Sequence, residues 1–362
     1  MTVTLDHVTR TVEGISHIRD VSLTLESGTL NVLLGPTLSG KTSIMRLLAA
    51  LDKPATGRVL VEGKDVTGFD VRRRSVAMVY QSFINYPTLS VYENIASPLR
   101  VARRPRAEID EKVHEAARLL RLEPYLQRMP LELSGGQQQR TALARALVKG
   151  ADLVLMDEPL ANLDYKLREE LREELPRIFL ARGSILVYST TEPSEALLLG
   201  GNVATLWQGR VTQFGRAADV FHHPADLVSA QVFSDPPLNL MRVEKRGRQL
   251  QLATGGTVAA SGAFERLADG AYVMGFRAHQ LYLREPALGA IVLPGRVQIS
   301  EITGSESFVH VDYEAVRWVA VAGGVHEIAP GTVIDTFVDP ARVFVFTEAG
   351  ALAAAPLVAD AA

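Results

Sequence analysis

The chain has 362 residues, a formal net charge of −3, a sequence pI of about 6.3 and no cysteine. This charge gives no electrostatic basis for binding nucleic acid, and the lack of cysteine excludes disulfides and thiolate metal sites. The 47% of hydrophobic residues is enough for two buried cores, but no run approaches the ~18 apolar residues of a membrane-spanning helix. We therefore expect a soluble cytosolic protein of two domains that reaches a membrane only through a partner.

Short apolar runs alternate with amphipathic segments over the first part of the chain, a pattern typical of an α/β domain. Residues 31–34 (NVLL) predict a buried strand, which is followed by a glycine-rich turn and a helix over residues 41–51. Residues 107–122 predict an amphipathic helix within a helical subdomain of about residues 85–150. Two further apolar runs predict central strands, at residues 153–156 and 185–188.

The character of the sequence changes near residues 234–237 (SDPP). Beyond them, short strand patterns recur between glycines and prolines, which predicts an all-β domain over residues 236–350. The alanine-rich end, residues 351–362, is expected to be a flexible tail.

Residues 35–42 read GPTLSGKT and match the phosphate-loop pattern G-x-x-x-x-G-K-[ST] between a predicted strand and a predicted helix. Glycines allow backbone N–H groups to turn toward phosphates at the positive end of the helix dipole. Lys41 is expected to reach the β- and γ-phosphate oxygens, and Thr42 a magnesium ion. The alternative, a chance glycine turn, does not account for the flanking strand and helix.

Asp157 and Glu158 follow the second central strand directly. An acidic residue at the carboxyl edge of a buried strand beside a phosphate loop is where magnesium is held, so we assign Asp157 to the metal. Glu158 is then placed to polarise an attacking water. Two solvated acids at a strand end would be the simpler interpretation if no phosphate loop preceded them.

Residues 133–140 read LSGGQQQR and begin a predicted helix. This motif resembles the signature of the ATP-binding-cassette (ABC) ATPases, and the order of motifs is similar to theirs: phosphate loop, Gln81, signature, LMDEP and ANLD. The resemblance covers residues 1 to about 235. The tail, notably residues 301–313 (EITGSESFVHVDY), resembles the oligosaccharide-binding-like regulatory domain of carbohydrate importers. The whole chain resembles the ATPase subunit of bacterial importers of the maltose and glycerol-phosphate type.

The resemblance implies an ABC nucleotide-binding domain over residues 1–235, an oligosaccharide-binding-like (TOBE-type) domain over 236–350, and ATP and Mg²⁺ as cofactors. It assigns catalysis to Glu158 as general base, to Gln81, and to Thr191 at a degenerate switch position. The metal ligands are Thr42, Gln81 and Asp157. The nucleotide-binding residues are Val12, Gly35, Pro36, Thr37, Leu38, Ser39, Gly40, Lys41, Thr42, Ser43, Ser134, Gly135, Gly136, Gln137 and Asp164.

The resemblance also implies partners. Cassettes of this family pair so that Ser134 and Gly136 would contact the γ-phosphate held by the opposite chain, while Asp164 bridges the two sites. Two membrane-spanning permease subunits would be partners through the segment between Gln81 and Ile95, which would receive a short helix from the membrane subunit. A periplasmic solute-binding protein would belong to the same system, and the chain would lie peripherally on the cytoplasmic face of the bacterial inner membrane.

Three positions depart from the family pattern. Thr191 replaces the switch histidine that contacts the γ-phosphate, and losing one such donor typically costs about 2.7–4 kcal/mol in the transition state. Val12 replaces an aromatic residue that stacks on adenine, a contact worth about 1–3 kcal/mol by analogy with base stacking. Leu38 replaces a glycine, which restricts the backbone if that position needs a positive φ.

All three departures affect the chain's own nucleotide site, whereas its signature is intact. We therefore expect an impaired own site and pairing with a second, different ATPase, as in importers of glycerol. One alternative is a homodimeric sugar-importer ATPase in which Thr191 suffices. Another is a regulatory cassette that binds ATP with little turnover. A non-transport ABC protein is disfavoured because the β-rich tail is not expected in one.

Overall fold

The computed structural model describes residues 1–161, 163–253, 255–286, 288–314 and 316–356. The chain forms two compact units, Met1–Ala217 and Ala218–Ala362. The boundary thus lies before the position near residue 235 that the sequence predicts. Two contacts explain the difference: Asp226 forms a β-bridge with Ala351, and Ala230 packs in an apolar cluster with Phe344 and Phe346.

The first unit is built around a six-stranded sheet with the strand order β10-β9-β3-β8-β7-β6, of which all but β10 are parallel to their neighbours. Strands β3, β7 and β8 are buried along their whole length, as expected for parallel strands covered on both faces. The strands are β3 (Leu30–Leu34), β6 (Val76–Val79), β7 (Leu153–Asp157), β8 (Ile185–Thr190), β9 (Asn202–Trp207) and β10 (Arg210–Arg216).

A second, antiparallel sheet has the order β2-β1-β4-β5. Helix α1 (Lys41–Leu48) contributes Ile44, Met45, Leu47 and Leu48 to an apolar cluster that includes strands of both sheets. This packing fixes the helix that follows the phosphate loop. The strands are β1 (Thr2–Val12), β2 (Ile15–Glu26), β4 (Thr56–Val61) and β5 (Lys64–Asp65).

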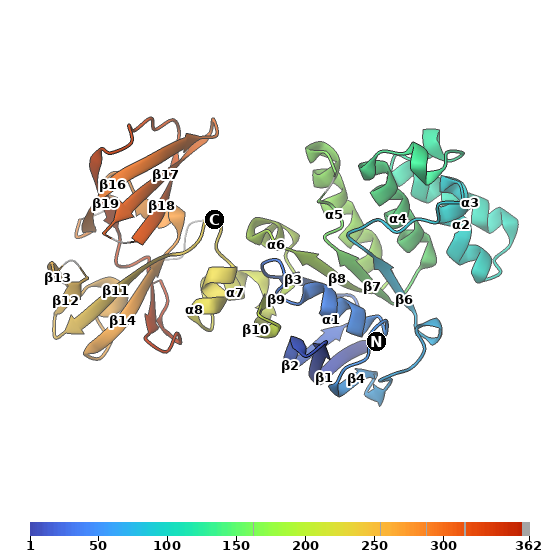
Figure 1. Ribbon diagram of the computed structural model, residues 1–362, viewed down its shortest axis with the longest axis horizontal. Helices are drawn as coiled ribbons and strands as arrows, with labels where there is room; N and C mark the ends of the chain where they lie inside the picture. The colour runs from blue at the N-terminus through green and yellow to red at the C-terminus, as the bar shows by residue number, and fades with distance from the viewer. Residues whose placement is uncertain (162, 254, 287, 315, 357–362) are drawn as a thin grey trace. The chain divides into compact units, whose positions relative to one another are not determined.

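A helical group occupies one end of the first unit, where α2 (Val91–Val101), α3 (Arg106–Leu119) and α4 (Gly135–Lys149) lie together (Figure 1). Capping boxes start two of these helices, at Ser90 and at Ser134, and satisfy backbone N–H groups that the helix leaves free. Helices α5 (Tyr165–Ala181) and α6 (Pro193–Leu199) follow β7 and β8. Among the described residues, no helix is both long and apolar enough to cross a bilayer.

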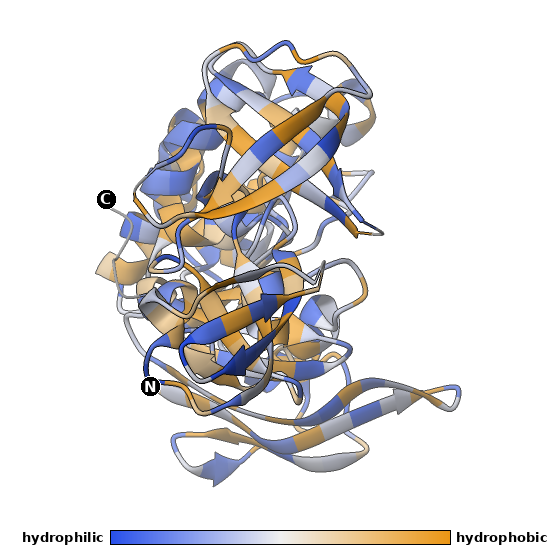
Figure 2. Ribbon diagram, turned by 90° about the vertical axis from the view of Figure 1, so that its left-hand side faces the viewer, coloured by the Kyte–Doolittle hydropathy of each residue, from blue (hydrophilic) through white to orange (hydrophobic). Residues whose placement is uncertain are grey.

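The second unit begins with the short helices α7 (Ala217–His222) and α8 (Leu227–Val232) and continues with two antiparallel sheets, of orders β13-β12-β11-β14-β20-β21 and β15-β19-β16-β17-β18. Polar and apolar residues alternate along its strands, as the colour bands of Figure 2 show, so each sheet turns one face inward. The side chain of Trp318 is buried and stacks on Tyr313, with ring centroids 4.4 Å apart.

The strands of the second unit are β11 (Asn239–Arg246), β12 (Gln249–Leu252), β13 (Thr257–Ala259), β14 (Gly270–Phe276), β15 (Leu281–Tyr282), β16 (Ile291–Ile302), β17 (Glu306–Tyr313), β18 (Val316–Gly323), β19 (Val333–Val338), β20 (Phe344–Thr347) and β21 (Leu352–Ala354). Part of the flexible tail expected from residue 351 onward is instead strand β21, which pairs with β20. Residues 357–362 of that expected tail lie outside the described residues.

Candidate active site

Four chain segments meet at one edge of the six-stranded sheet. The phosphate loop follows β3, Thr191 follows β8, Glu158 follows β7, and Gln81 lies two residues beyond β6. These strands are neighbours in the order β3-β8-β7-β6 and run parallel, so their carboxyl ends lie side by side. The carboxyl edge of such a sheet is where α/β proteins bind ligands.

The phosphate loop needs its glycines for space and for backbone conformation. A Cβ at Gly35 would lie 2.5 Å from the carbonyl oxygen of Leu206 and 2.6 Å from Oγ of Ser39. Gly40 caps α1 with a φ of 107°, a region that side chains rarely adopt. Leu38 also has a positive φ, 67°, and its side chain is 96% exposed. The position that carries leucine in place of glycine is therefore a strained one.

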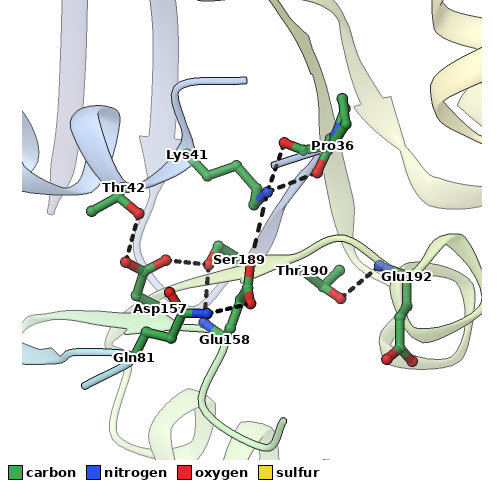
Figure 3. Close-up of polar contacts among 10 residues, drawn as sticks. Pro36, Lys41, Thr42, Gln81, Asp157, Glu158, Ser189, Thr190 and Glu192 are labelled. Atoms are coloured by element: carbon green, nitrogen blue, oxygen red, sulfur yellow. Dashed lines mark hydrogen bonds and ion pairs between the residues drawn. The ribbon is translucent and has the colours of Figure 1, made fainter. Parts of the chain in front are cut away.

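Lys41 is almost fully buried at the start of α1. Its Nζ donates to the carbonyl oxygens of Gly35, at 2.7 Å, and Pro36, at 3.1 Å, and lies 3.8 Å from a carboxylate oxygen of Glu158 (Figure 3). Burial lowers the pKa of the Lys41 ammonium, while Glu158 and Asp157 oppose the shift. The ammonium thus lies inside the loop, where an anionic phosphate would replace two neutral carbonyls as its partner.

Asp157 is the buried end of β7 and accepts two hydrogen bonds. Thr42 Oγ1 donates to one carboxylate oxygen at 2.7 Å, and Ser189 Oγ donates to the other at 2.6 Å. No cluster of three or more His, Asp or Glu side chains among the described residues can hold a metal alone. Mg²⁺ commonly uses one or two protein oxygens together with substrate phosphates, so Thr42, Asp157 and Gln81 fit the ion.

Glu158 lies next to Asp157 with a φ of 46°, which turns its side chain away from the strand direction. Gln81 Nε2 donates to its carboxylate at 2.9 Å, and the backbone N–H of Glu158 donates to Ser189 Oγ at 3.0 Å. Gln81 and Glu158, 77 positions apart, are thus direct partners. A carboxylate held in this way can accept a proton from a water molecule.

A cleft of about 670 Å³ lies over the phosphate loop. Its lining includes Lys41, Thr42, Gln81 and Glu158 on one side, with Ile15, His17 and Arg19 from β2. Val12, which pairs with Ile15 where β1 and β2 meet, is not among the described residues that line it. Ile15 and His17, rather than Val12, thus line the cleft over the phosphate loop.

Thr191 is exposed immediately after β8, in the position that the sequence comparison with the family assigned to the switch histidine. Thr191 and Glu158 line the same small cavity, and Glu158 alone of the two is among the described residues that line the phosphate-loop cleft. The preceding Thr190 is buried and accepts a hydrogen bond from the Glu192 N–H at 3.0 Å. Only Thr191 of this pair is free to face a ligand.

The signature residues lie elsewhere on the chain. Ser134 and Gly135 are exposed at the start of α4, where Ser134 and Gln137 form a capping box. Among the described residues that line the phosphate-loop cleft, none comes from residues 133–137. Asp164 caps α5 by accepting from the Leu167 N–H at 3.0 Å. The phosphate loop and signature of one chain thus do not share a cleft.

Ser189 and Arg168 are site residues that the sequence analysis did not identify. Ser189 is fully buried and links Asp157 to the backbone of Glu158. Arg168, in the first turn of α5, lines the cavity beside Glu158 and Thr191. The available signal for Ser189 was the run of hydroxyl-bearing residues that ends β8, Tyr188 to Thr190, whereas the charged sequence of α5 gives none for Arg168.

Replacing Leu38 with glycine is expected to stabilise the protein slightly. A left-handed L-residue costs about 1–2 kcal/mol, while glycine costs about 0.5–1 kcal/mol of additional backbone entropy on folding. The net gain should therefore be at most about 1 kcal/mol in the free energy of unfolding, measured by urea denaturation. Leu131→Gly is the matched control: Leu131 is also exposed, at 87%, but has no positive φ, so this change should destabilise. If the two changes altered the free energy of unfolding equally, the backbone at Leu38 would not be strained.

Tyr188→Phe should make stability less dependent on alkaline pH. Burial, together with Glu195, raises the pKa of Tyr188 well above the ordinary value of 10.0. Above pH 10 the unfolded chain loses this proton and the folded chain keeps it, so stability falls as pH rises, by up to about 1.4 kcal/mol per unit. Urea unfolding at pH 9 to 11 should show a shallower fall in Tyr188→Phe. Tyr165→Phe, at an exposed residue of α5, should keep the wild-type slope.

A largely parallel sheet with a phosphate loop and two adjacent acidic residues, Asp157 and Glu158, at one edge is the arrangement of a nucleotide-binding ATPase cassette. The ABC transporter family matches residues 18–161. The chain is 34% identical to the trehalose/maltose import ATP-binding protein MalK of Thermococcus litoralis over 350 residues, covering 92% of this chain and 94% of MalK. It is 35% identical to the sn-glycerol-3-phosphate import ATP-binding protein UgpC of Rhizobium meliloti, over 85% and 87% of the two chains. The chain belongs to the ATP-binding proteins of the ABC transporter family.

The first unit also resembles a solved cassette. The dimeric structure of a post-hydrolysis state of MJ0796, bound to ADP and Pi, matches with a TM-score of 0.55 and 29% identity. That match covers 59% of this chain and 98% of MJ0796. The cassette fold and the ATPase class expected from the sequence are therefore confirmed.

Proposed function

We propose that this chain is the ATP-hydrolysing subunit of an ABC importer for a small carbohydrate or polyol, with glycerol as the specific candidate. The observation that carries the proposal is the joint presence of Lys41, Thr42, Gln81, Asp157 and Glu158 at one sheet edge, in a chain similar over most of its length to maltose and glycerol-phosphate import proteins. The partners would be two permease subunits and a periplasmic solute-binding protein. The chain would then lie on the cytoplasmic face of the inner membrane.

The proposed chemistry is hydrolysis of ATP by an in-line water. Bound Mg²⁺ would neutralise developing charge on the phosphates. Lys41 exchanges the carbonyls of Gly35 and Pro36 for phosphate oxygens. Glu158 accepts a proton from the attacking water, and Gln81, its hydrogen-bond partner, orients both. Ser189 and Thr42 keep the Asp157 carboxylate fixed at the metal position.

A second cassette completes each site in this proposal. The exposed signature at Ser134 and the phosphate-loop cleft of the same chain are separate, so the signature is free to serve the cleft of a partner. Thr191 and the strained Leu38 weaken this chain's own site, while its signature retains the family residues. This asymmetry favours a different ATPase as the partner, whose site would carry most of the turnover.

The proposed permease-docking surface is the segment of residues 81–95 together with α2. Ile84 and Tyr86 are exposed there, and Arg145 lies over the Tyr86 ring at 5.1 Å. Tyr86, Val101 and Arg145 line a groove of about 270 Å³. An apolar groove with an exposed aromatic rim suits a short amphipathic helix. In this segment Phe83 is only partly exposed, with a φ of 46°.

The experiment is purification of the tagged chain from its own cell in mild detergent, with every co-purifying polypeptide identified by mass spectrometry. Two different cassettes and two permease subunits would support the mixed importer. This chain as the single cassette would support the homodimer, and a complex without permeases would overturn the transport function. A regulatory cassette would co-purify in the same way but would leave ATP turnover unchanged when Glu158 is replaced.

A matched pair of variants locates the permease contact. Ile84→Arg places a charge in the proposed docking surface and should remove the permeases from the purified complex while keeping the second cassette. Ile299→Arg, at a similarly exposed isoleucine of β16, should keep both. Loss of the permeases from the second variant alone would contradict the assignment of residues 81–95.

A further inference from the structure

A small cavity of about 30 Å³ lies beside Glu158 and Thr191, with room for about one water molecule. Its charged lining is unbalanced. Glu158, Glu192 and Glu195 contribute three carboxylates, and Arg168 is the one basic side chain among the described residues that line it. A histidine at position 191 would have added a second positive charge near here. The positive charge on this side of Glu158 therefore comes from Arg168.

Arg168 is hydrogen-bonded to the loop between β7 and α5. Its Nη2 donates to the carbonyl oxygen of Ala161 at 3.3 Å, which holds the loop between β7 and α5. Its Nε is buried and has no hydrogen-bond acceptor among the described residues. Buried donors in native structures are nearly always satisfied, so this N–H points to an acceptor that arrives in another state of the site.

The carboxylates of the cavity differ in their present partners. Glu195 accepts from the Tyr188 hydroxyl at 2.6 Å. Glu158 accepts from Gln81 and has Lys41 at 3.8 Å. When Lys41 turns to phosphate, Glu158 loses this basic neighbour, and Arg168 is the one basic side chain among the described residues that line the cavity.

We propose that Arg168 is a positioning residue for hydrolysis at this chain's own site. Its hydrogen bond holds the loop at Ala161 beside the cavity that Thr191 also lines, and its charge keeps the Glu158 carboxylate in place once nucleotide has drawn Lys41 away. Arg168 thereby takes over part of the electrostatic role of a histidine at position 191. The inference rests on the proposed function, because it requires some turnover at this site.

The test is a double-mutant cycle between positions 168 and 191. ATP hydrolysis is measured for Arg168→Gln and Arg168→Lys, each in the wild-type chain and in Thr191→His. We expect Arg168→Gln to lower kcat on the order of tenfold with KM little changed in the wild-type chain, and by less than about threefold in Thr191→His. Arg168→Lys should fall between wild type and Arg168→Gln. Arg177→Gln, at an exposed residue of the same helix that pairs with half-buried Glu174, should change nothing in either background.

The outcomes separate the inference from the proposed function. An equal loss in both backgrounds, or no loss, would overturn the role of Arg168 while leaving the ATPase intact. Absence of turnover in all variants would instead count against the proposed function. In that case, amide hydrogen exchange of the free chain tests the role of Arg168. Arg168→Gln should speed exchange in the peptides that contain Ala161 and Thr191. Unchanged exchange in these peptides would overturn the proposed role of Arg168. Thermal melting identifies any variant that fails to fold.

Discussion

Thr191→His is expected to raise ATP hydrolysis by the purified chain on the order of 100-fold. A histidine at this position can donate a hydrogen bond and carry positive charge toward the γ-phosphate, whereas a threonine can donate only through its hydroxyl. Removing one preorganised donor from a developing negative charge typically costs a factor of about 10²–10³, so restoring it should recover much of that factor. The measurement is phosphate release at a protein concentration that allows two copies to pair.

Comparing Thr191→Val with the wild type shows how much the threonine hydroxyl contributes to the rate. Valine keeps the shape of threonine and removes the hydroxyl, so any further fall in rate measures the contribution of that hydroxyl. Thr191 is exposed, and neither substitution should change the melting temperature. Rapid hydrolysis by the wild type with no gain in Thr191→His would mean that another group already contacts the γ-phosphate and that the site is not impaired.

Glu158→Gln in the Thr191→His background should remove the gained activity, lowering the rate by a factor of about 10²–10⁴. The amide keeps the shape of the carboxylate and its contact with Gln81 but cannot accept the proton of the attacking water. ATP binding should persist, because Lys41 and the phosphate loop are unchanged. Phosphate release and the binding of a fluorescent ATP analogue, measured on the same preparation, distinguish the two effects.

The control for this change is Glu173→Gln, an exposed glutamate of α5 whose loss alters the net charge equally. Its hydrolysis and ATP binding should match those of the parent. If Glu158→Gln kept full activity, the general base would have to be another residue, and the assignment of the edge of β7 as the catalytic position would fail.

Two residues at this site hold positive φ angles that side chains usually avoid. Glu158 has a φ of 46° and Leu38 a φ of 67°. Strain of this kind typically costs about 1–3 kcal/mol and persists where the surrounding structure enforces it. For Glu158 the strained turn aims the carboxylate at Gln81 and the cleft. For Leu38, no packing of the side chain compensates for the strain, because the side chain is 96% exposed.

Motifs that depend on residues close together in the chain could be predicted from the sequence. The phosphate loop, the buried strands predicted over residues 153–156 and 185–188, and the helix that begins at the signature each depend on residues within a few positions of one another. The helix expected over residues 107–122 is α3, which begins one residue earlier and ends three earlier. Local hydrogen bonding and periodic apolar spacing are sufficient to specify such elements.

Tertiary structure alone decided which side chains meet. The contact between Gln81 and Glu158 and the support of Asp157 by Ser189 arise because β6, β7 and β8 are neighbours in the sheet, an order that the spacing of the strands along the chain does not reveal. The same holds for Ile15 and His17, rather than Val12, at the cleft. The sequence by itself determined the class of chemistry, because its motifs carry the reacting groups. The fold determined their partners, because long-range pairing of strands places residues far apart in the chain at one edge.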